Sequence, residues 1–267
     1  MRWVAAIAAM AMLAACGETE SDALSQTEQR MAELKAATID LRYAATAGAG
    51  DSQTDPVGFQ LAGPFEFSDK HDLAVFDLTY TRLLGGDEEV TAVRSTGESA
   101  FATVEDTTYK IDDRDLDSLR ISDDTDGGLG DLGIADWVRN PKTAPGDKID
   151  GELTDVITGD VDVAAMLSDL ARISESVGGD TELGDLDDDA ASRLQKLVKA
   201  SEIKIVTTSK NYDLKSLRAV VDFGTTAPAQ LRKSLGAYAD ARLAITLTLK
   251  KATKQLRVEA PANYEEA

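Results

Sequence analysis

The alternation of apolar and polar residues predicts a protein built mainly from antiparallel strands. In the clearest segment, 241–249, Leu243, Ile245, Leu247 and Leu249 alternate with charged, small or hydroxyl-bearing residues. A period of two places every second side chain on one face, so this strand buries one face and exposes the other. Comparable short strands are predicted at 59–67, 76–81, 89–96, 99–104, 107–111, 153–160, 202–208, 216–223 and 255–260.

Four segments carry helical rather than strand periodicity. Apolar residues recur at helical spacing in 161–173, and further helices are predicted at 24–37, within 133–140 and at 187–200. Pro64 predicts that its strand is an edge strand or is bent. Because neither a linker nor a repeat follows residue 56, the pattern predicts one α+β domain with roughly eight to ten antiparallel strands and three or four helices.

The first sixteen residues resemble an export and lipidation signal. Arg2 precedes the uncharged apolar run 3–12, which is too short to span a bilayer and is typical of a secretory signal peptide. The run ends in Leu-Ala-Ala-Cys at Cys16, the only cysteine, and this resembles a bacterial lipobox. The resemblance implies acylation of the Cys16 thiol, with palmitate-type chains, and cleavage before it. We expect a signal peptide at 1–15, a lipidated Cys16 with a polar tether at 16–23, and a folded domain at 24–267; an ordinary signal peptide with an incidental cysteine is the alternative.

Charge and composition exclude several classes of function. The chain has 48 acidic and 28 basic residues, a net charge of −20, and loss of Arg2 with the signal peptide leaves 27 basic residues and −21. Nucleic-acid affinity comes mostly from Lys and Arg on phosphates, so we expect no nucleic-acid partner. One cysteine forms no internal disulfide, and one histidine builds no His-rich zinc site. We expect no metal and no cofactor.

Three short motifs suggest chemistry that their surroundings do not support. Residues 128–133 match the dinucleotide fingerprint, but a run of turn-forming residues precedes them instead of a buried strand, which predicts a loop. The acidic run 112–126 aligns with a calcium loop, but Gly133 then occupies the position of the final glutamate. We expect a solvated acidic loop there, with loose calcium binding as the alternative. His71 lies between two strands without a nucleophile elbow, so a turn histidine is expected rather than a hydrolase.

Three segments, in this order, resemble the mycobacterial lipoproteins of the LppX/LprG type. Along the chain, the first is the strand, acidic turn and aromatic at 101–109. The second is the Gly-led turn and strand at 149–162, which leads into the helix at 163–173. The third is the last strand, ending in Ala-Pro, at 256–261. The resemblance implies a LolA-like fold: a strongly curved antiparallel β-sheet, or half-barrel, closed by helices over an apolar cavity. It also implies a non-enzymatic role at the extracytoplasmic face of the cell membrane. The protein would bind acyl chains of a lipid or glycolipid for transport or presentation in the envelope, with an envelope transporter or other protein as a partner.

The apolar side of the strands supplies the candidate wall of such a cavity. Burial of an alkyl chain contributes about 0.8 kcal/mol per CH₂, so binding requires no charged contact. Periodicity leaves a second outcome open, in which the same residues form a dry core and the acidic loops of a structural or regulatory envelope lipoprotein bind a protein partner. The candidate wall residues are Phe59, Leu61, Phe65, Phe67, Phe76, Leu78, Tyr80, Phe101, Tyr109, Ile157, Met166 and Leu170.

Overall fold

The computed structural model describes most of the predicted folded domain. The predicted signal peptide, Cys16 and most of the acidic run lie outside the described residues, as do the side chains of 170–176. The residues described are 20–47, 54–67, 71, 73–112, 116, 132–176, 195–223 and 241–266.

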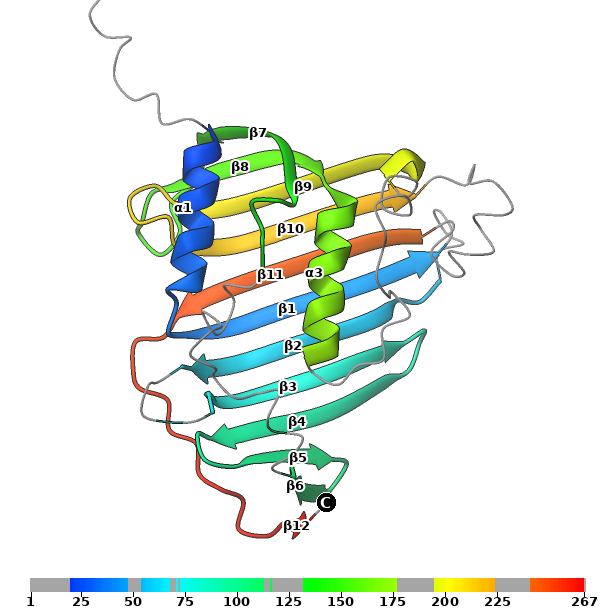
Figure 1. The fold of residues 1–267 in the computed structure, drawn as a ribbon, viewed down its shortest axis with the longest axis vertical. Coiled ribbons are helices and arrows are strands. Elements are labelled where there is room, and N and C mark those ends of the chain that lie inside the picture. Colours follow the sequence, from blue (N-terminus) through cyan, green and yellow to red (C-terminus); the bar gives the residue numbers. More distant parts are fainter. Residues whose placement is uncertain are drawn as a thin grey trace, which may run out of the picture.

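Within the described residues, twelve strands form one open, curved sheet that carries two helices, α1 and α3 (Figure 1). The strand order is β12-β6-β5-β4-β3-β2-β1-β11-β10-β9-β8-β7. Neighbouring strands are antiparallel, except that β12 runs parallel to β6. The elements are α1 (Glu20–Ala32), β1 (Ala36–Ala47), β2 (Val57–Glu66), β3 (Val75–Leu84), β4 (Glu88–Thr96), β5 (Ala100–Val104), β6 (Thr107–Lys110), β7 (Val138–Pro145), β8 (Thr154–Val161), α3 (Val163–Ser176), β9 (Val198–Thr208), β10 (Leu214–Phe223), β11 (Ala241–Lys251) and β12 (Glu265–Glu266).

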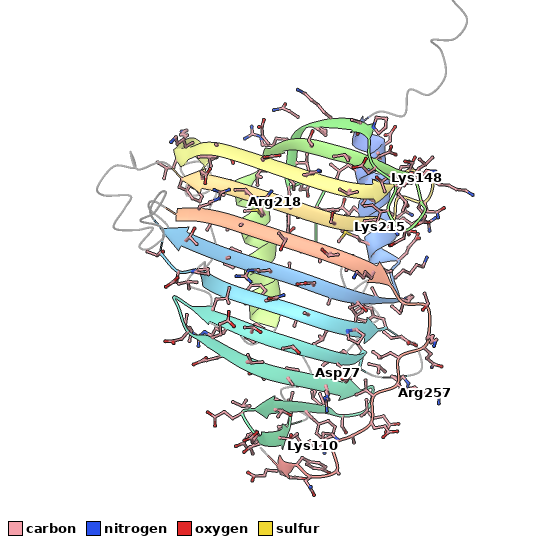
Figure 2. The ribbon with its side chains drawn as sticks, turned by 180° about the vertical axis from the view of Figure 1, so that it is seen from behind. Asp77, Lys110, Lys148, Lys215, Arg218 and Arg257 are labelled. Atoms are coloured by element: carbon pink, nitrogen blue, oxygen red, sulfur yellow. The ribbon has the colours of Figure 1, made fainter. Side chains whose placement is uncertain are left out.

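Both helices lie on the same face of the sheet, here called the helix-bearing face. In Figure 1, α1 crosses β7 to β11 and α3 crosses β9 to β2. Seen from behind, the other face, here called the back face, carries no helix among the described residues (Figure 2). The arrangement is therefore two-layered over β7 to β2, and the main hydrophobic core lies between the helices and this part of the sheet.

The segments with the strongest periodicity fold as their patterns predict. The strand predicted at 241–249 is confirmed as β11, in the middle of the sheet between β1 and β10. The strand and helix predicted at 153–160 and 161–173 are confirmed as β8 and α3. The molecule is nonetheless mostly strand, with fewer helices than the α+β prediction suggested within the described part of the chain.

Several predicted boundaries are wrong where a tertiary contact overrides the local pattern. The predicted helix at 24–37 is α1, which ends at Ala32 so that β1 begins at Ala36. The helix predicted within 133–140 is a turn followed by β7, an edge strand that tolerates prolines because one side of its backbone needs no ladder bonds. The strand predicted at 255–260 is absent; there the Leu256 amide donates to a Glu66 carboxylate oxygen at 2.7 Å. Of the helix predicted at 187–200, the structure describes only 195–200, and β9 already begins at Val198.

The prediction that Pro64 lies in an edge strand is wrong. Its strand, β2, is no edge strand, because it pairs with β1 on one side and β3 on the other. The ladder to β3 is interrupted between the pairs Ala62–Thr79 and Phe65–Phe76, where proline offers no N–H. Gly63 adopts φ +143° there, and a Cβ at this position would collide with the Asp77 carbonyl. The interruption is therefore built by a Gly-Pro pair in the interior of the sheet.

Candidate functional site

Apolar side chains run in rows across the strands of the helix-bearing face. The pairing register places Leu61, Leu41 and Leu247 side by side on β2, β1 and β11. The same row continues through Leu217, Ile205 and Ile157 on β10, β9 and β8. Because directly paired residues of an antiparallel sheet project to the same side, this row forms a continuous apolar band across six strands.

The helices bury one part of this face completely. Met166 on α3 is 1% exposed, and Met31 on α1 is 2% exposed. Beneath the helices, Ile157, Ile205 and Leu217 are at most 1% exposed. This side of the sheet, over β8 to β11, is therefore a dry packed core, which is the outcome that the sequence left open as the alternative.

The same face is only partly covered over β2 to β6: Phe65, Phe76 and Ala100 are still at most 8% exposed, and Ala100 packs in a second cluster with Leu73 and Leu116. Phe59, Leu61, Leu78 and Tyr80 are only half-buried, although they continue the rows of the buried core. Farther along, the helix-bearing face exposes four large apolar side chains that lie in register with these rows. They are Val57 (52% exposed), Leu84 (37%), Val104 (47%) and Tyr109 (37%).

Aromatic rings connect the buried and the open parts of the face. The ring of buried Tyr43 lies 5.8 Å from that of Phe59, which lies 6.1 Å from that of Tyr80. Phe65 and Phe67 form a second pair, with ring centroids 5.2 Å apart. Aromatic rings at such separations stabilise one another in addition to the apolar area that they bury. These contacts make the wall more rigid where no helix packs on it.

Nine of the twelve predicted wall residues share the helix-bearing face or its helix. Eight are the sheet residues Phe59, Leu61, Phe65, Phe76, Leu78, Tyr80, Tyr109 and Ile157, and the ninth is Met166 on α3. Phe67 follows the end of β2 and packs against the same core. The side chain of Leu170 lies outside the described residues.

The prediction for Phe101 needs correction. It pairs with Arg94, which pairs with Asp77, and Asp77 is seen on the back face (Figure 2). Phe101 is therefore on the back face too, and is 3% exposed because the ring of Tyr264 lies 5.2 Å away. The two neighbours of Phe101 in β5 are alanines, so the strand has no alternation of apolar and polar residues that would show which face is buried.

A buried carboxylate joins α3 to the turn before β7. Asp169 is 7% exposed, and its Oδ2 accepts hydrogen bonds from Trp137 Nε1 at 2.7 Å and from the Gly133 amide at 3.0 Å. Gly133, the last residue of the glycine motif, thus binds a carboxylate of its own chain. Sequence reasoning missed Asp169, although its place among the apolar residues of the helix was a usable signal.

Glu28 on α1 lies against the same cluster. Burial raises its pKa above the usual range, and the nearby Asp136 and Asp169 raise it further, while a backbone hydrogen bond at Ala135 acts in the opposite direction. The two helices and the turn at 134–137 are therefore coupled through carboxylates rather than through apolar contacts alone.

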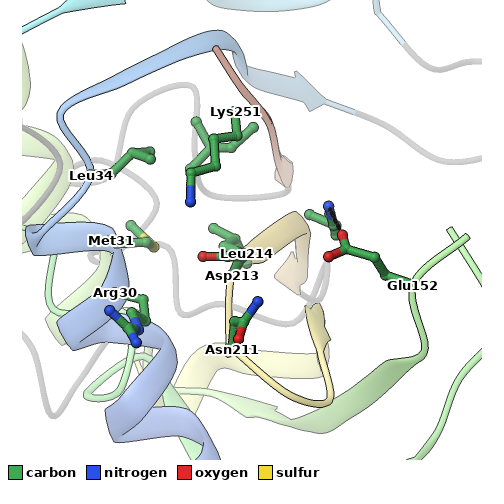
Figure 3. A pocket seen from close by; sticks show the side chains of 10 residues that line it. Arg30, Met31, Leu34, Glu152, Asn211, Asp213, Leu214 and Lys251 are labelled. Carbon is green, nitrogen blue, oxygen red and sulfur yellow. Dashed lines mark hydrogen bonds and ion pairs between the residues drawn. The ribbon is translucent and has the colours of Figure 1, made fainter. Parts of the chain in front are cut away.

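The pocket of about 220 Å³ in Figure 3 lies between α1 and the strands β10 and β11, away from the open apolar face. Lys215 Nζ donates to Glu152 Oε2 at 2.8 Å, and this hydrogen bond, together with the lysine charge, lowers the pKa of Glu152. Its wall is a mixture of apolar and charged groups and includes none of the predicted wall residues: Arg30, Met31, Leu34, Glu152, Asn211, Asp213, Leu214, Lys215, Leu249 and Lys251. Helix closure over an enclosed apolar cavity is thus not seen among the described residues.

Other kinds of site are not apparent in the described part of the chain. No group of three or more Asp, Glu, His or Cys side chains there is arranged to hold a metal ion. None of the described helices is both long enough and apolar enough to cross a membrane. The half-buried His71 lies against Gly97.

Comparison with solved structures identifies the architecture. LprF from Mycobacterium bovis superimposes with a TM-score of 0.51 at 12% identity, covering 91% of this chain and 97% of LprF. This chain has the fold of LprF. The resemblance to the LppX/LprG-type lipoproteins is thereby confirmed at the level of fold. Weaker likenesses are the Mycobacterium tuberculosis lipoprotein LppX (TM-score 0.44, 14% identity, 90% and 98% covered) and a DUF1329 family protein from Desulfovibrio piger (0.24, 8%, 89% and 93%). No protein-family model and no curated protein matches the sequence.

Proposed function

We propose that this protein is an extracytoplasmic lipoprotein that is anchored through Cys16 and binds an acyl chain of a lipid or glycolipid on its helix-bearing face. The binding surface is the open part of that face over β2 to β6. The role is carriage or presentation of the lipid in the cell envelope, without catalysis. The fold shared with LprF and the lipobox at Cys16 support the same proposal independently.

One observation carries the proposal: a single set of apolar rows is sealed at one end and open at the other. In a sheet that only formed a core, these rows would end where the helices end. Here they continue through Leu61, Leu78 and Tyr80 to Val104 and Tyr109, which are 47% and 37% exposed. A contiguous exposed apolar surface is typical of an interaction or ligand site.

The open surface suits a lipid that has a long chain and a small polar end. Each methylene covered by the wall contributes about 0.8 kcal/mol, so several methylenes laid along the rows suffice for useful affinity. Within the surface, between Tyr80 and Leu84 on β3, Arg82 pairs with Glu89 at 3.6 Å, and both side chains are about 60% exposed. One cation beside one anion favours a neutral or zwitterionic headgroup over one with a net charge.

Strand β4 offers a matched pair of variants, because Val93 faces the helix-bearing side and Val90 the back face. Uptake of a fluorescent fatty acid by the mature chain, with native mass spectrometry for bound lipid, should weaken in V93Q and remain unchanged in V90Q. Circular dichroism checks that both variants keep the fold. Equal uptake by V93Q and wild type, or no uptake by any of them, contradicts the proposal.

The fully packed half of the sheet favours the second candidate, a structural or regulatory lipoprotein without a lipid ligand. Mass spectrometry of the chain from a lipidating bacterial host tests the anchor at Cys16 separately from lipid binding on the helix-bearing face. A diacylglyceryl group on Cys16 that disappears in C16S establishes the anchor, whatever the result for lipid uptake. An acylated protein that takes up no lipid is the result that the second candidate predicts.

A further inference from the structure

A row of four cations crosses the back face of this acidic protein. The ladder pairs Lys142 with Thr158 and Thr158 with Lys204, and then Lys204 with Arg218. It continues from Arg218 through Thr246 to Arg42. The row holds four basic side chains, two threonines and no acid over the six strands from β7 to β1, in a chain with 48 acidic residues. The members of this basic row are Lys142, Lys204, Arg218 and Arg42.

These four side chains are available for an outside partner. Lys142, Lys204 and Arg218 are exposed and Arg42 is half-exposed; Figure 2 shows Arg218 on the back face. The ion pairs among the described residues engage other cations, and none of the four side chains makes an ion pair or a hydrogen bond there, although the Lys142 carbonyl accepts one from Thr158 Oγ1. With strands about 4.8 Å apart, the row extends for about 24 Å.

We propose that the basic row holds the back face against the anionic headgroups of the membrane that anchors the protein. This rests on the anchor of the proposed function. Three residues separate Cys16 from Glu20, so the acylated cysteine lies at most about 14 Å from the start of α1. Figure 1 shows that α1 begins at the β7 edge of the sheet, the same edge at which the basic row begins with Lys142.

The anchor explains why a membrane fits better than a soluble polyanion. Four cations attract a soluble polyanion only against the repulsion of a body whose net charge is −21 once Arg2 is removed with the signal peptide. A tethered protein already resides at the surface at a high effective concentration, so a weak local attraction is enough to orient it. Because α1 lies on the helix-bearing face at the β7 edge, the tether passes round this edge to the membrane, and the helix-bearing face, with the proposed lipid site, then points away from it.

The orientation is testable with a single thiol, because acylation consumes the only native cysteine. Thr246 lies in the middle of the basic row, and Thr79 is an exposed threonine on the same face, on β3, two strands beyond the Arg42 end of the row. T246C and T79C variants of the lipidated chain are labelled with a polarity-sensitive dye and placed in phosphatidylcholine vesicles with or without phosphatidylglycerol. We expect the Thr246 label, and not the Thr79 label, to become membrane-contacting only with phosphatidylglycerol, and to lose this contact at high salt.

A charge-matched control isolates the basic row. In the T246C background, K204Q with R218Q should reduce the membrane-contacting fraction by about fivefold for each charge removed, whereas K110Q with K254Q should leave it unchanged. If acylation is incomplete, a chain held on nickel-chelating lipid through an N-terminal histidine tag tests the same contact between the basic row and the membrane. Equal contact with both vesicle types overturns the proposal, as does contact that persists unchanged at high salt. Fatty-acid uptake is measured separately, so that a failure of the proposed lipid binding and a failure of the proposed membrane orientation can be told apart.

Discussion

Removal of the Asp169 carboxylate should uncouple α3 from the turn that precedes β7. In D169A, the indole of Trp137 and the amide of Gly133 lose an acceptor at 2.7 and 3.0 Å within a site that is 7% exposed. An unsatisfied buried donor costs about 1–3 kcal/mol, so the loss in unfolding free energy should be about 2–6 kcal/mol. In D169N an oxygen acceptor of the same shape remains, so the loss should be smaller than in D169A.

The chain itself provides the reporter for this experiment. Besides Trp137, its only tryptophan is Trp3, within the predicted signal peptide, so fluorescence of the mature protein reports on this site. Urea unfolding followed by tryptophan fluorescence gives the free energies, and D136A removes an exposed carboxylate from the same turn as a control, with an expected change within about 0.5 kcal/mol. A D169A variant as stable as D136A would refute the assignment of Asp169 as the residue that holds α3.

Three further predictions concern α1, one turn and the C-terminal segment. Burial raises the pKa of Glu28, so the folded protein takes up this proton more readily than the unfolded chain. The free energy of unfolding should therefore rise as the pH falls through the folded-state pKa toward 4.5. E28Q should raise Tm at pH 7 and flatten this pH dependence, and a lower Tm would contradict the reasoning. G97A should lower the free energy of unfolding by about 1–3 kcal/mol, and by more than G151A, in thermal unfolding. Both glycines have positive φ, but only at Gly97 would a Cβ meet a side chain, the ring of His71. Equal losses in the two variants would exclude a steric contribution from His71. Y264A removes the ring over Phe101 and should cost about 0.5–1.5 kcal/mol and speed proteolysis after residue 251, with unchanged proteolysis as the contrary result.

The regular elements of this protein were largely predictable because their periodicity is local. Residues 241–249 alternate strictly, and 161–173 repeat at helical spacing, so β11 and α3 followed from the chain alone. The same periodicity also placed most wall residues on one face, since Phe59, Leu61 and Phe65 are separated by even numbers of positions. For these segments the local pattern and the tertiary environment require the same conformation.

Elements at the margins of the sheet were predicted less well, because their environment rather than their pattern decides their structure. Pro141 and Pro145 argue against a strand, yet both lie in β7, whose outer side has no partner strand among the described residues. Phe101 was placed on the wrong face, because the residue that covers it, Tyr264, comes from a segment more than 150 residues farther along the chain. No local signal carries that contact.

The sequence by itself determined the apolar face, the predicted export signal and the resemblance to the LppX/LprG type, because periodicity and motif order are properties of the linear chain. Only the tertiary structure decided which part of that face is sealed and which is open, because this depends on where α1 and α3 cross the strands. Strand order likewise decided that Lys142, Lys204, Arg218 and Arg42 form one row, since residues far apart in the sequence become neighbours only through the register of the sheet.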